Sequence, residues 1–95
     1  MNFTEFLSCT KTNSPPDGLS EILMSLWWDK KGDWTRAHAI AQEIYTKQGS
    51  AVHAYLHRRE GVMWNADYWY SQAGLQRPDI SLDEEWERLV QATLG

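Results

Sequence analysis

Positive charge and cysteine are both scarce in this sequence. There is one cysteine, Cys9, so an intrachain disulfide is excluded and a metal site needs other ligand types. Nine basic residues stand against 13 acidic ones, which gives a formal net charge of −4, and the basic runs are only two residues long. Proteins that grip a phosphate backbone carry a basic face. The composition therefore predicts no nucleic-acid partner.

Long hydrophobic runs are also absent. No apolar stretch approaches the ~20 residues of a transmembrane helix. Residues 1–9 have neither the basic start nor the long apolar segment of a signal peptide. The chain also lacks the phosphate-binding motif GxGxxG, the P-loop and the nucleophile motif GxSxG. We expect no membrane contact, no cofactor and a cytoplasmic location.

Tryptophan, by contrast, is abundant. There are six in 95 residues, together with four Tyr and two Phe, and hydrophobic residues make up 42% of the chain against 23% charged. This is the composition of a folded globule and the length of a single domain. The six indole rings must either fill a small core or remain on the surface.

Apolar residues recur at helical spacing, and no alternation of period two is long enough for a strand. Glycine, proline and polar caps divide the chain into an N-terminal arm and five helices. The expected helices are residues 19–31, 34–48, 51–60, 64–73 and 82–94. The sequence thus predicts an all-α single domain, with an arm over residues 1–16, a central part over 17–78 and a C-terminal helical part over 79–95.

Two parts of the chain begin alike. Gly32 and Ala37 recur as Gly61 and Ala66, 29 residues later. Small alanines at these points let two antiparallel helices approach closely. The full second pattern is Gly61, Met63, Ala66, Tyr70, Ala73 and Pro78. This order is similar to the second half of a tetratricopeptide repeat, and residues 66–74 resemble the Ala-x-x-Trp-Tyr-x-x-Ala core of Sel-one-like repeats.

The resemblance implies a compact antiparallel bundle of about five helices, in which two tetratricopeptide-like hairpins are followed by a C-terminal capping helix. By fold analogy it also implies a small interaction or adaptor module that binds a protein or peptide in a groove between the first and third helices. The side chains expected in this groove are Trp28, His53, His57, Arg58 and Glu60.

His53, His57 and Glu60 are also a candidate metal site. The four-residue spacing places both imidazoles on one helical face, and Glu60 follows three residues later. Two histidines and a carboxylate can bind Zn²⁺ or Fe²⁺. In the plainer interpretation they only bridge the core edge to solvent. We favour the interaction module; the alternatives are a small metal-dependent or acid/base enzyme centred on these residues and a homodimer without ligand.

Helical spacing divides the aromatic residues into two groups. Those on the main apolar stripes, expected in the core, are Trp34, Trp69 and Trp86. Those off the stripes or at helix ends, expected to be exposed, are Trp27, Trp64 and Tyr68. Exposed aromatic side chains often mark binding surfaces.

Overall fold

The computed structural model describes residues 1–94, and within them the regular secondary structure consists of six helices and no strand. The helices are α1 (Phe3–Cys9), α2 (Glu21–Lys30), α3 (Trp34–Ala41), α4 (Lys47–Glu60), α5 (Met63–Gln72) and α6 (Leu82–Leu94). The all-α prediction is confirmed. The expected count of five is too low, because the N-terminal arm contains a helix of its own.

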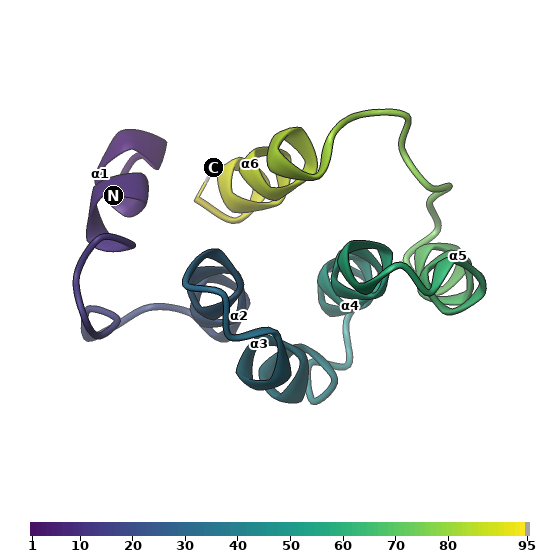
Figure 1. Ribbon diagram of the computed structural model, residues 1–95, viewed down its shortest axis with the longest axis horizontal. Coiled ribbons are helices and arrows are strands. Elements are labelled where there is room, and N and C mark those ends of the chain that lie inside the picture. Colours follow the sequence, from purple (N-terminus) through teal and green to yellow (C-terminus); the bar gives the residue numbers. More distant parts are fainter. Residues whose placement is uncertain (95) are drawn as a thin grey trace.

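Figure 1 looks roughly along the helix axes and shows how the six helices are arranged. Helices α2 to α5 follow one another in an arc, with α2 packed against α3 and α4 packed against α5. Helix α6 crosses back over α2 and α4, and α1 packs on α6. Among the described residues, α5 packs against α4 alone. One face of α5 is therefore left without a neighbouring helix.

Helix α1 forms because its first turn is capped twice. The Asn2 side chain accepts a hydrogen bond from the Glu5 backbone amide, and the Glu5 carboxylate accepts one from the Asn2 amide. Phe6 is fully buried, and the rings of Phe3 and Phe6 lie about 6 Å from the Trp86 ring. The arm is thus a short helix anchored by its aromatic side chains to α6.

The two similar sequence segments take the same turn conformation. Gly32 and Gly61 both have a φ of +87°, a left-handed conformation that side chains with a Cβ adopt at a cost. Helices α3 and α5 each begin two residues later. Ala37 and Ala66 are both fully buried. Each glycine lets the chain reverse, and each alanine lets the following helix pack closely on the preceding one.

The boundary between α3 and α4 differs from the expectation of helices over 34–48 and 51–60. Helix α3 ends at Ala41, and α4 begins at Lys47, where the Thr46 hydroxyl accepts a hydrogen bond from the Gly49 amide at 3.0 Å. Gly49 therefore lies in the first turn of α4 and does not end a helix. A Cβ at this position would clash with the carbonyl oxygen and side chain of Ile44. This glycine permits a close approach of the preceding turn.

Two indole N–H groups hold α1 and α6 to α2. Trp27 donates to the Cys9 carbonyl at 3.1 Å, and Trp86 donates to the Leu26 carbonyl at 2.9 Å. Trp27 is fully buried, so its expected exposure is wrong. The expectation assumed that α2 buries one stripe. Other helices cover α2 on more than one side, since α3, α4 and α6 all pack against it.

A buried polar network joins α4, α5 and α6. The Arg58 guanidinium lies 2.7 Å from one Glu85 carboxylate oxygen, and the Tyr70 hydroxyl donates to the other at 2.6 Å. Burial, together with the hydrogen bond to Glu85, raises the pKa of Tyr70, so the phenol keeps its proton and remains a donor. Since α5 and α6 do not pack directly, this network helps to fix their relative position.

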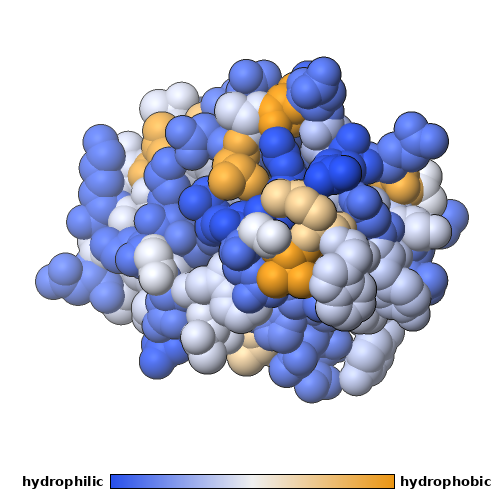
Figure 2. Space-filling view, turned by 45° about the vertical axis from the view of Figure 1, so that its right-hand side comes forward, coloured by the Kyte–Doolittle hydropathy of each residue, from blue (hydrophilic) through white to orange (hydrophobic). Residues whose placement is uncertain are grey.

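The surface seen in Figure 2 is mostly hydrophilic, with hydrophobic side chains gathered in small, separate patches. In the part of the chain that the structure describes, no helix has the length and apolar character needed to cross a bilayer.

Candidate functional site

All three histidines of the chain meet at one place. His38 lies on α3, and His53 and His57 lie on α4. One ring nitrogen from each can be chosen so that the three atoms all lie within 4.8 Å of one another. The Nε2 atoms of His38 and His53 are 2.9 Å apart. We call these three residues the histidine cluster.

The packing of α3 on α4 creates this cluster. His53 and His57 are one helical turn apart, so they share a face of α4. His38 is in the last turn of α3, which packs against α4. His53 and His57 are each only 6% exposed, whereas His38 is partly exposed. The cluster therefore lies at the edge of the core, with His38 on its solvent side.

Two tryptophans hold the imidazole rings in place. The Trp34 ring stacks on His38, with centroids 4.7 Å apart and planes inclined by 13°. The Trp69 ring from α5 stacks on His53 at 4.1 Å and 22°. The Trp34 indole is itself fixed by its hydrogen bond to the Leu56 carbonyl at 2.7 Å. Contacts from α3, α4 and α5 thus restrict the orientation of the His38 and His53 rings.

Glu60 orients the third ring. Its carboxylate oxygen lies 2.6 Å from the His57 Nδ1 atom, one turn away on α4. In the neutral imidazole this contact places the proton on Nδ1, which leaves the Nε2 lone pair free. A carboxylate bonded to the distal nitrogen of a histidine is the usual outer partner of a metal-binding imidazole.

The surroundings of the cluster disfavour protonation of His53 and His38. Burial, with smaller contributions from His38 and His57, lowers the pKa of His53 to about 4. Burial and then the charge of His57 also lower the pKa of His38. At neutral pH both rings are therefore uncharged, the form in which imidazole binds a metal ion.

The donor set suits a borderline transition metal. It offers neutral imidazole nitrogens, which bind Zn²⁺, Cu²⁺, Ni²⁺ or Co²⁺, whereas Mg²⁺ and Ca²⁺ prefer oxygen ligands. Tetrahedral zinc with Zn–N bonds of 2.0–2.1 Å places two ligand nitrogens about 3.3 Å apart. The His38 and His53 Nε2 atoms, now at 2.9 Å, need to separate by only a few tenths of an ångström. The His57 nitrogen, which lies within 4.8 Å of the other two, must move closer by up to about 1.5 Å. The donor types and their convergence fit such an ion after this adjustment.

Not all of the residues that were expected to share one groove lie together in the structure. His53, His57 and Glu60 lie together. However, Glu60 contacts His57 and is not itself part of the histidine cluster, whose third imidazole belongs to His38. Trp28 and Arg58, the other residues expected in the groove, have partners of their own. Arg58 binds Glu85 and the Ile80 carbonyl, and Trp28 packs on Trp27 and carries the Arg36 guanidinium over its ring at 4.1 Å.

His38 was not among the residues expected in the site. The available signal was its spacing, because His38 lies four residues after Trp34 and three before Ala41, on the apolar face of its helix. That spacing places His38 on the face that packs, but it does not say that the opposite helix presents two histidines. The contact depends on how α3 crosses α4.

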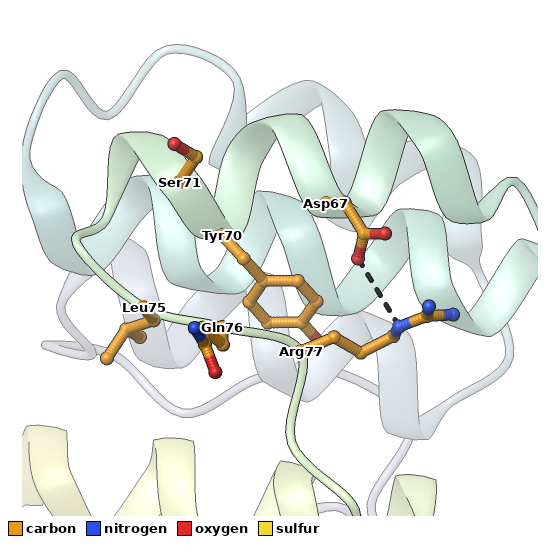
Figure 3. Close-up of a pocket in the computed structure, with 6 residues that line it drawn as sticks. All are labelled: Asp67, Tyr70, Ser71, Leu75, Gln76 and Arg77. Carbon is orange, nitrogen blue, oxygen red and sulfur yellow. Dashed lines mark ion pairs between the residues drawn. The ribbon is translucent and has the colours of Figure 1, made fainter.

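The surface pocket in Figure 3 lies elsewhere, beside the C-terminal end of α5, and has a volume of about 430 Å³. The Tyr70 ring points toward the strap formed by Leu75 and Gln76, and Arg77 reaches across to pair with Asp67 at 3.3 Å. Both members of this pair are well exposed. The charged residues of this pocket thus pair with each other, and the Tyr70 hydroxyl already donates to Glu85, so the histidine cluster is the better candidate site.

Comparison of the chain with protein-family models, curated proteins and solved structures finds no match.

Proposed function

We propose that this protein binds one transition metal ion, zinc foremost, through His38, His53 and His57. The observation that carries the proposal is the convergence of three imidazoles from two helices, with ring nitrogens within 4.8 Å of one another. The Glu60 contact to His57 and the tryptophan stacking on the other two rings support it, because both hold the ligands in fixed orientations.

Simple core filling is a poor explanation for this arrangement. A buried imidazole costs free energy unless its nitrogens are hydrogen-bonded, and an apolar residue of similar size avoids that cost. Here the contact of His53 through Nε2 is to another histidine, so one ring must donate a proton to the other. A metal ion can take the place of this contact once the donating ring carries its proton on Nδ1, and it then binds one nitrogen of each of the three rings.

Zinc titration by calorimetry tests the proposal on protein prepared without an affinity tag and freed of metal with a chelator. The chain without substitutions, once freed of metal, is expected to bind one Zn²⁺. His38→Gln is expected to weaken zinc binding by more than about 100-fold, because one of the three direct metal ligands is lost. His38 is the least buried of the three, so this variant is the one best suited to retain the fold.

Cys9→Ser is the matched control, because it removes the single thiol, the other strong zinc ligand, from a different part of the molecule. This variant should bind zinc as the original chain does. Circular dichroism checks that both variants remain helical. Absence of zinc binding in the original chain, or equal affinity in a folded His38→Gln variant, would contradict the proposal.

A second candidate function is that of a helical interaction module, built from tetratricopeptide-like hairpins α2–α3 and α4–α5. It is favoured by the unpartnered face of α5, where Trp64 and Tyr68, one turn apart, are 76% and 54% exposed. Tryptophan and tyrosine are enriched at the centres of protein interfaces. We propose that this face contacts a protein, in the first instance a second copy of the chain.

Light scattering tests this second candidate. The chain is expected to form a dimer, and the double variant Trp64→Ser, Tyr68→Ser is expected to have the monomer mass of 11.0 kDa. Tyr45→Ser is the control, since Tyr45 is 86% exposed but lies in the turn between α3 and α4. A monomer at every concentration, or dissociation by the control, would contradict the role of this face.

A further inference from the structure

The number of protein ligands at the histidine cluster has a chemical consequence. Over residues 1–94, the His, Cys, Asp and Glu side chains that converge closely enough to share an ion are the three histidines alone. The Glu60 carboxylate is close by, but its oxygen is engaged with His57 Nδ1. Structural zinc sites are closed by four protein ligands, whereas catalytic sites have three and hold a water molecule in the fourth position.

The fold gives a second reason to regard the site as open. Small proteins that need a metal to fold lack a sufficient core. This chain has one without the ion, since Phe6, Leu26, Trp27, Tyr55 and Val90 are fully buried and come from four helices. A fourth ligand that locks the ion in place is therefore not required for stability.

Solvent can reach the cluster from one side. Trp34 and Trp69 cover the outer faces of His38 and His53. His38 itself is partly exposed, and the Glu60 side chain is 33% exposed. The edge between the end of α3 and the end of α4 is thus the direction from which a small molecule can approach.

We infer that a metal ion held by His38, His53 and His57 has one coordination position open to water or to a small anion. The ion then acts as a Lewis acid and does not serve only to stabilise the fold. The inference rests on the proposed metal site. It assigns a ligand class: water or hydroxide, and small anions such as azide or thiocyanate that replace them. In catalytic zinc sites of this type, the bound water loses its proton near neutral pH and becomes a nucleophile.

Cobalt substitution tests the open position directly. Co²⁺ takes the same ligands as zinc, and its visible absorption reports the ligands and the geometry around the ion. Metal-free protein is first titrated with Co²⁺ to one equivalent, and the complex is then titrated with azide or thiocyanate. We expect a saturable change in the cobalt spectrum with a stoichiometry of one anion per ion.

The outcomes separate the two claims. If Co²⁺ and Zn²⁺ do not bind, the proposed metal site itself is wrong. If one ion binds per chain but the cobalt spectrum does not change with either anion, the metal site is supported and the inference of an open coordination position is wrong.

The Glu60→Gln variant tests whether Glu60 is a fourth metal ligand. The amide oxygen can still accept the His57 Nδ1–H bond, so the fold and the response to anions should persist, while metal affinity falls by about 10- to 100-fold. A response to anions that appears only in Glu60→Gln would show that Glu60 occupies the fourth position, which contradicts the inference. Glu84→Gln, an exposed change on α6, is the control and should leave affinity and spectrum unchanged.

Discussion

Replacing Trp86 with alanine is expected to lower the free energy of unfolding by about 3–5 kcal/mol. Trp86 is 3% exposed and lies where α1, α2 and α6 meet. Its ring packs against Phe3 and Phe6, and its indole N–H donates to the Leu26 carbonyl. The substitution therefore opens a cavity and also removes the buried hydrogen bond between the indole and α2.

Urea denaturation followed by circular dichroism measures this loss, and the chain provides a matched control. Trp64→Ala removes the same side chain from α5, where it is 76% exposed. Its effect should stay within about 0.5 kcal/mol, as for other surface substitutions. A similar loss in both variants would mean that the α1–α2–α6 contact does not contribute as the structure indicates.

Acidification of the metal-free protein is expected to lower the free energy of unfolding through His53 by about 2 kcal/mol at pH 5 and about 3 kcal/mol at pH 4. The pKa of His53 is about 4 in the fold, against about 6.5 for the unfolded chain. Between these values the unfolded chain binds a proton that the folded chain does not, so stability is full above pH 6.5 and falls as the pH decreases. The titratable groups around His53 are His38 on α3 and His57 on α4, and Glu60 contacts His57 in turn.

Urea denaturation in the presence of a chelator, repeated from pH 7 to pH 5, measures this dependence. His53→Gln lacks the titrating ring, and its stability should fall by about 2 kcal/mol less than that of the original chain over the same interval. Comparing the two chains removes the contribution of the exposed carboxylates, which titrate in both. Equal pH dependence in the two chains would contradict the neutral, buried state of His53.

Local patterns predicted the helices because caps and spacing act within a few residues. The helix expected from residue 34 begins there, because the Asp33 side chain accepts a hydrogen bond from the Arg36 amide. The helix expected to end at residue 60 does so, because Gly61 follows it with a φ of +87°. The boundary expected between residues 48 and 51 is wrong, because the role of Gly49 is a contact with Ile44 that no capping rule contains.

The candidate site was half predictable. His53 and His57 could be placed on one face because a four-residue spacing on a helix fixes their relation. Glu60 was expected as a third metal ligand, whereas its position as the partner of His57 Nδ1 depends on side-chain geometry. His38 lies 15 residues before His53, and only the packing of α3 on α4 brings the two within 2.9 Å.

The sequence by itself determined that this protein is helical, where most of its turns lie and that His53 and His57 share a face. These are local properties, set by backbone conformation and by periodicity within one helix. The tertiary structure decided that Trp27 is buried, that Trp64 is exposed and that a third histidine joins the other two. Each of these depends on which helix faces meet, because the same apolar or aromatic face is core when another helix covers it and surface when none does.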